Sequence, residues 1–301
     1  MKQKSIISRR EFLKNASKTA MGSALFLTPF AKKGMTHEHV RQKTTVVLVR
    51  NKAVLNASVK PDYRVVLDML DKGITTLIGE KNPVQCWKKL LKKDDIVGIK
   101  SNVWKYIPTT SQVENAIKKR VLDAGIPENR IGVGDRGILR NTIFKNATAL
   151  INVRPMRSHH WSGVGSLIKN YIMFVPRPWD YHDDSCADLA TIWKLPIVKD
   201  KTRLNVLVMF TPQFHGKGPH SFNPKYVWKY YGMIMGFDPV AVDSIGVRIL
   251  QAKRKDFFGE ERPLNPPPKH VFLADTRHNL GTADPDKIKL IKLGYQEDIL
   301  I

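Results

Sequence analysis

Runs of β-branched and apolar residues alternate along the chain with segments in which apolar residues recur at helical spacing. The short runs predict strands at 44–50, 95–100, 130–133, 149–153, 204–210 and 232–237, and a last edge strand at 287–294. Apolar residues at helical spacing predict helices at 63–70, 83–91, 111–124 and 238–250. An N-cap residue or a proline marks the start of some of these helices. We therefore expect an α/β fold, with a parallel or mixed sheet, helices on both faces in Rossmann-like layering, and room for a second, smaller lobe.

The first 31 residues differ from the rest of the chain. The string Ser8-Arg9-Arg10-Glu11-Phe12-Leu13-Lys14 precedes a short apolar stretch at 19–27 and a small residue, Ala31. This order is similar to that of twin-arginine export signals. The apolar stretch is about half of the ~20 residues that a spanning helix needs, so no stable transmembrane span is expected. The sequence thus predicts Arg9 and Arg10 as signal residues, the twin-arginine translocation machinery as a partner, and a periplasmic or otherwise exported location.

Behind this signal we expect a linker at 32–43, the α/β domain at 44–281, and a C-terminal edge strand and tail at 282–301. The chain of 301 residues is 42% hydrophobic, which is enough for a sizeable core and excludes a disordered tail. Residues 1–34 carry +7 of the net charge of +23, so the remainder is still basic at +16. The lysines are scattered and no nucleic-acid-binding motif occurs, so no specific nucleic acid is expected. A non-enzymatic polyanion-binding protein at the cell envelope is an alternative.

Only two cysteines occur, Cys86 and Cys186, which excludes an iron–sulfur cluster built from this chain alone. Whether they form a disulfide is left open. The string at 132–137 matches G-x-G-x-x-G, but its strand is not the first, and the position about twenty residues on is basic rather than acidic. NAD or FAD is therefore not expected, and the string is better explained as a tight turn that carries Asp135 at a strand end.

Polar residues gather where predicted strands end. Ligands of open α/β sheets bind beyond the carboxyl ends of the strands, which directs attention to Lys100, Asn102, Asp135 and the segment 152–170. That segment is dense in glycines, hydroxyls and basic groups. We expect a small anion, a carboxylate or a phosphate, held by Lys100, Asn102, Arg157, Lys169 and nearby backbone amides.

Three candidate catalytic residues follow from the same pattern. His159 is a candidate general base because an imidazole titrates near neutral pH, and Lys169 a candidate nucleophile or base because it follows an apolar pair. Asp135 and Asp243 could orient cations or bind a metal. The cofactor is unknown, but His159 and His182 are candidate ligands for a divalent metal.

The order of these motifs resembles that of the family catalogued as domain of unknown function 362. The matching residues are Ile99-Lys100-Ser101-Asn102, Thr109-Thr110, Gly134-Asp135, Ile151-Asn152-Val153, Arg157-Ser158-His159, Lys169-Asn170, Arg177, His182 and 236–243. The resemblance adds Thr110, Asn152, Asn170 and Arg177 to the expected ligand-binding residues. The chain departs from the family in having Arg157 for a lysine, Ser101 for a proline, and Met209-Phe210-Thr211 where relatives tend to have an aspartate.

A shorter segment resembles nickel-pincer lactate racemases, because His159, Gly163, Lys169 and His182 come in a similar order. This resemblance implies hydride abstraction and return at a hydroxy-acid carbon as an alternative function. A third alternative is an assembly factor for a cofactor enzyme exported with it. Whether the protein is an enzyme is left open at this point.

Overall fold

The computed structural model describes residues 43–216, 218 and 222–301. The expected signal, with Arg9 and Arg10, and most of the expected linker lie outside these residues. The described residues from Lys43 onward belong to one compact unit. Among the described helices, none combines the length and the apolar character that crossing a bilayer requires.

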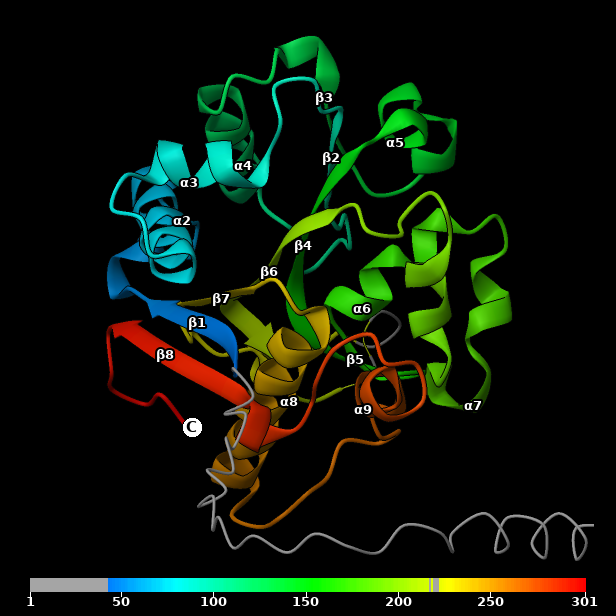
Figure 1. Ribbon diagram of the computed structural model, residues 1–301. Helices are drawn as coiled ribbons and strands as arrows, with labels where there is room; N and C mark the ends of the chain where they lie inside the picture. Colours follow the sequence, from blue (N-terminus) through cyan, green and yellow to red (C-terminus); the bar gives the residue numbers. More distant parts are fainter. Residues whose placement is uncertain (1–42, 217, 219–221) are drawn as a thin grey trace, which may run out of the picture. The chain divides into compact units, whose positions relative to one another are not determined.

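A single mixed sheet organises the described residues (Figure 1). Its strands are β1 (Thr44–Arg50), β2 (Val97–Lys100), β3 (Ile131–Gly134), β4 (Ala149–His159), β5 (Gly163–Gly165), β6 (Thr202–Gln213), β7 (Gly232–Gly236) and β8 (Ile288–Gly294). They lie in the order β3-β2-β4-β6-β7-β1-β8, with β5 paired to β4. β3, β2, β4 and β6 are mutually parallel, whereas β7 runs antiparallel to both β6 and β1. The expected α/β class with a mixed sheet is confirmed.

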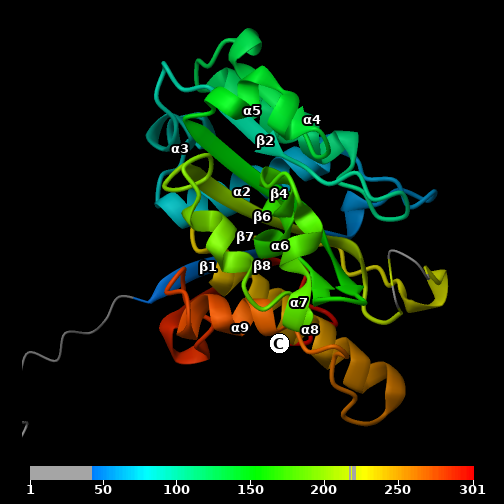
Figure 2. The same ribbon diagram turned by 90° about the vertical axis from the view of Figure 1, so that its right-hand side faces the viewer.

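Helices cover both faces of the sheet (Figure 2). One face packs against α2 (Tyr63–Ile78), α3 (Pro83–Leu90) and α4 (Ser111–Asp123). The other packs against α5 (Thr142–Asn146), α6 (Leu167–Asn170), α7 (Asp183–Cys186), α8 (Pro239–Phe258) and α9 (Lys269–Thr276). Alternation along the strands explains this, since Val47 and Ile151 join the first core and Leu48 and Leu150 join the second.

β4 is longer than the sequence predicts. We expected a strand at 149–153 followed by a loop, but the strand continues through Pro155 to His159 and turns back into β5. The pairing of β4 with β6 shifts register between Pro155 and Arg157, which accommodates a residue without an N–H donor. The extension matters for the site, because it makes Arg154, Arg157 and His159 residues of a buried strand rather than of a surface loop.

Candidate functional site

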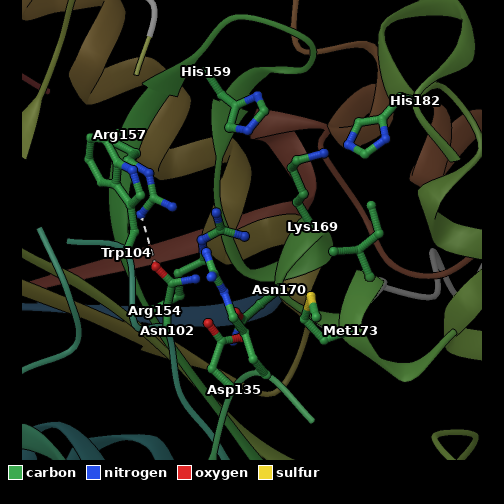
Figure 3. Close-up of a pocket in the computed structure, with 12 residues that line it drawn as sticks. Asn102, Trp104, Asp135, Arg154, Arg157, His159, Lys169, Asn170, Met173 and His182 are labelled. Carbon is green, nitrogen blue, oxygen red and sulfur yellow. Dashed lines mark hydrogen bonds between the residues drawn. The ribbon is translucent and has the colours of Figure 1, made fainter. Parts of the chain in front are cut away.

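A cavity of about 260 Å³ lies beyond the carboxyl ends of β2 and β3, with residues of β4 and α6 in its wall (Figure 3). The residues that the sequence singled out and that line it are Asn102, Asp135, Arg157, His159, Lys169, Asn170 and His182. The cavity also contains residues that sequence reasoning missed as ligand contacts: Trp104, Arg136, Arg154, Ile172 and Met173. The strand-end location is the one expected for an α/β sheet.

Four of the expected ligand-binding residues lie elsewhere. Lys100 and Asn152 are fully buried and do not line the cavity. Thr110 lines a separate hollow of about 160 Å³ together with Tyr106 and Phe210. Arg177 is exposed and pairs with Asp180, with 3.1 Å between Nε and Oδ2. Thr110 and Arg177 are therefore not brought together with the other candidates.

Lys100 and Asp135 form a buried ion pair beside the cavity. Lys100 Nζ lies 2.5 Å from Asp135 Oδ1 and also donates to the Ser101 carbonyl at 2.7 Å and to Asn170 Oδ1 at 3.3 Å. The other Asp135 oxygen accepts from the Val103 N–H at 2.9 Å. Burial alone would raise the pKa of Asp135, but the Lys100 ammonium and these hydrogen bonds hold it below its ordinary value. Both charges are thus compensated within the protein.

Asn170, which lines the cavity, is connected to the sheet by hydrogen bonds, one of them through Asn152. The Asn170 amide donates to Asn152 Oδ1 at 2.9 Å and to the backbone carbonyls of Lys100 and Val153. Asn152 in turn donates to the Leu167 carbonyl and to Asn205 Oδ1, both at 3.1 Å. Asn152 therefore positions Asn170 from behind the cavity.

Three other cations around the cavity lack such compensation. Arg154, Arg157 and Lys169 are each almost completely buried, and none forms an ion pair with a carboxylate of the described residues. Arg154 donates to the Ser166 carbonyl at 3.3 Å and Arg157 to Asn102 Oδ1 at 3.1 Å, but the Nε–H of each guanidinium has no hydrogen-bond partner there. Buried charges and donors of this kind are costly unless something pairs with them.

Neighbouring residues hold these guanidinium groups in place. The Arg157 guanidinium carbon lies 4.3 Å from the centroid of a Trp104 ring, a cation–π contact. Gly165 on β5 gives Arg154 its room, because a Cβ atom at this glycine would lie 2.8 Å from Arg154 Nη2. Packing and hydrogen bonds thus hold the two groups, without an ion pair to a carboxylate of the described residues.

Burial shifts the pKa values of all three cations downward. It lowers the pKa of Lys169 to about 8, with the charge of Arg154 acting in the same direction and Cys186 opposing it. It lowers the pKa of Arg154 to about 10 against the opposing effects of Asp135 and Asp243, and it lowers that of Arg157 as well. A bound anion would act against these shifts, because an opposite charge favours the charged form of each group.

The Lys169 amine forms its hydrogen bond with a thiol. Its Nζ lies 3.3 Å from Cys186 Sγ. Cys186 follows Asp184 and Ser185 in three consecutive residues with φ of 45°, 60° and 64°, in the left-handed region that non-glycine residues avoid. Such residues cost about 1–3 kcal/mol each and tend to cluster at functional sites. Burial raises the pKa of the thiol, so Cys186 is not a ready counter-charge.

Both histidines of the cavity have lowered pKa values, which favours the neutral imidazole near neutral pH. Burial, followed by the charge of Lys169, lowers the pKa of His182 to about 4 and shifts that of His159 downward as well. His159 Nδ1 accepts the Trp161 N–H at 3.2 Å, which places the proton of its neutral ring on Nε2. The described residues contain no group of three or more His, Cys, Asp or Glu that could hold a metal ion. His159 and His182 share the cavity but do not make a metal site by themselves.

Asp243, which the sequence suggested as a cation or metal ligand, is engaged in hydrogen bonds within the protein. From α8 it accepts hydrogen bonds from Ser166 Oγ at 2.7 Å and from the Leu167 and Ile168 N–H groups, both at 2.9 Å. Burial raises its pKa to about 6, although these bonds favour the charged form. Asp243 therefore fixes the start of α6, the short helix that carries Lys169 and Asn170.

The two cysteines are free and buried on opposite faces of the sheet, Cys86 in the core with α2 to α4 and Cys186 in the core with α8 and α9. They do not form a disulfide in this structure.

Comparisons with curated proteins and with solved structures give no match. A comparison with family models gives a match over part of the chain. The matched part includes the cationic residues Arg154, Arg157 and Lys169 as well as both cavity histidines. Residues 136–248 match the model of the family described as Domain of unknown function (DUF362), which supports the resemblance found in the order of the motifs.

Proposed function

We propose that the protein binds a small anionic ligand, a carboxylate or a phosphate, in the cavity at the carboxyl ends of β2 and β3. One observation carries the proposal: Arg154, Arg157 and Lys169 line the same cavity without a carboxylate partner among the described residues. Removing a charge from water costs several kcal/mol unless an opposite charge or hydrogen bonds replace the water. A bound anion would supply both and would also accept the unused Nε–H donors.

The size and position of these cations favour a small ligand over a polymer. A polyanion-binding surface would carry its unpaired cations on exposed faces, where a long chain can reach them. Here the three cations are almost completely buried in a cavity of about 260 Å³. The alternative of a polyanion-binding protein at the cell envelope therefore draws its support only from the net charge.

The test compares two lysine variants of the full chain. Thermal unfolding is followed with increasing phosphate, acetate or lactate, because a ligand that binds the folded state raises the melting temperature. We expect Lys169→Ala to fold and to lose this stabilisation. The matched control is Lys289→Ala, which removes the same charge from an exposed position on the edge strand β8. Normal stabilisation of Lys169→Ala by every anion that stabilises the wild type would refute the assignment.

We further propose that the protein is exported through the twin-arginine pathway, on the support of the string at 8–14. The test is cell fractionation of a variant with Arg9→Lys and Arg10→Lys. We expect the variant to accumulate inside the cell at full length. Unchanged export of the double variant would reject this route.

A further inference from the structure

Two buried lysines near the cavity differ in what their amines contact. Lys100 Nζ donates hydrogen bonds to the Asp135 carboxylate, the Ser101 carbonyl and Asn170 Oδ1. Lys169 Nζ has the Cys186 thiol as its hydrogen-bond partner and no carboxylate within the described part of the chain. A lysine amine attacks carbon only when it is neutral and free of strong partners, so Lys169 meets a requirement that Lys100 does not.

The surroundings of Lys169 favour the neutral amine. Its side chain is buried, and the guanidinium groups of Arg154 and Arg157 line the same cavity without forming an ion pair with a carboxylate of the described residues. Desolvation and a nearby cation are two means by which proteins activate a lysine nucleophile. The lowered pKa of Lys169, about 8, agrees with this arrangement.

The directions of the side chains suit a particular substrate. In Figure 3 the Lys169 amine points between the rings of His159 and His182, with the Arg154 guanidinium on the other side of the same space. A carboxylate bound to the guanidinium groups would hold an adjacent carbonyl group near the amine. Asp243 and the hydrogen bonds of Asn170 keep α6, and with it Lys169, at a fixed position.

We propose that Lys169 captures the carbonyl carbon of a small 2-oxo acid as an imine, with the carboxylate of that acid held by Arg154 and Arg157. This inference rests on the proposed anion-binding function. The neutral amine forms a carbon–nitrogen bond and gives up its two protons in turn, and the carbonyl oxygen leaves with them as water. His182, whose ring faces the amine in Figure 3, can carry these protons.

The experiment traps the imine. The full chain is incubated with pyruvate or 2-oxoglutarate and treated with borohydride, whose hydride reduces an imine to a stable secondary amine. Intact mass and peptide mapping then locate the product. We expect one reduced adduct on the peptide that carries Lys169, none on Lys100, and loss of this adduct in Lys169→Arg. The control variant Lys289→Ala, whose lysine is exposed on β8, should be labelled like the wild type.

Lactate distinguishes failure of the imine proposal from failure of the proposed anion binding. Lactate has the carboxylate and a hydroxyl in place of the carbonyl, so it should raise the melting temperature, compete with pyruvate and leave no adduct. If lactate and pyruvate both stabilise the protein and neither labels Lys169, the imine is refuted and the anion pocket stands. If neither oxo acid stabilises or labels the protein, the imine is likewise refuted. The phosphate and acetate titrations then decide the anion pocket separately.

Discussion

Lys100 and Lys169 are both buried basic side chains at one end of the same sheet, yet they sit in opposite electrostatic situations. Lys100 is paired with Asp135 and held by two further oxygens, whereas Lys169 lies with two guanidinium groups and a thiol. Burial lowers the pKa of each to about 8. The comparison shows that the pKa of a buried lysine does not reveal its role. We infer the roles of the two lysines from whether the protein itself supplies the opposite charge.

The largest effect expected from this comparison is on stability. Lys100→Met would leave the Asp135 carboxylate buried without its cation, and breaking a buried pair in this way costs about 3–5 kcal/mol. Urea unfolding of the variant and the wild type measures the difference. Removing both charges in Lys100→Met with Asp135→Asn should recover much of the loss. A single variant as stable as the wild type would show that Lys100 is not compensated as described.

Lys169→Met should behave in the opposite way. It removes a buried cation that has no carboxylate partner, so we expect unfolding stability equal to or above that of the wild type. Affinity for a small anion should fall by about 1.5–3 kcal/mol, the range for hydrogen bonds to charged groups. Calorimetric titration with lactate measures the affinity, with Lys289→Met as the control. A large loss of stability together with unchanged affinity would reverse the roles assigned to the two lysines.

The affinity for a small anion should depend on pH through Lys169. The pKa of Lys169 in the free protein is about 8, so its amine is mostly neutral above this pH. The amine must then gain a proton before it can pair with an anion. Affinity for lactate should therefore fall by up to about tenfold per pH unit above pH ~8. Lys169→Arg, which stays charged, should flatten the profile between pH 8 and 9. A wild-type profile that is flat over this range would contradict a cationic Lys169 in the complex.

Stability of the unliganded protein should change with pH in the other direction. The folded-state pKa of Lys169 lies below its ordinary value of 10.5, so between pH ~8 and ~10.5 the unfolded chain holds more protons than the folded one. The contribution of Lys169 to stability therefore rises with pH across this window, and Lys100 acts with the same sign.

The smallest expected effect on anion affinity comes from Trp104, whose ring contacts the Arg157 guanidinium. Trp104→Leu removes the cation–π contact at 4.3 Å but leaves the guanidinium and its bond to Asn102. We expect anion affinity to weaken by about 0.5–2 kcal/mol, measured by the same titration. Trp104→Phe keeps a ring and should lose less. Equal losses in the two variants would indicate that Trp104 acts through packing alone.

The fold followed from local pattern more readily than the site did. The run at 44–50 is β-branched and apolar, and β1 has those bounds; the capping residue Asp238 and Pro239 also mark the start of α8 correctly. The end of α8 at Phe258 was missed, because a polar helix surface such as 251–256 carries little apolar periodicity. Elements end where tertiary packing ends, and packing is not visible in a local pattern.

The sequence predicted where the site lies but not which side chains point into it. Strand-end reasoning found Asp135, Arg157 and Lys169, because the ends of parallel strands meet at one edge. It missed Arg154, because the strand was expected to end at Val153. For a residue beyond the end of a strand, the pattern does not say toward which face of the sheet its side chain points. Alternation along an extended strand, which places Arg154 on the face of Asn152 and opposite Val153, was the available indication. Trp104 resembled any core aromatic, and the exposed position of Arg177 depends on a turn that its spacing does not specify.

The most direct test of the central claim is a crystal structure of the protein with selenate, a tetrahedral anion whose selenium can be located by anomalous scattering. We expect an anomalous peak inside the cavity, within hydrogen-bond reach of Arg154, Arg157 and Lys169, and we expect this peak to disappear in Lys169→Met. Selenate ordered only against surface lysines, with none in the cavity of the wild-type protein, would contradict the account.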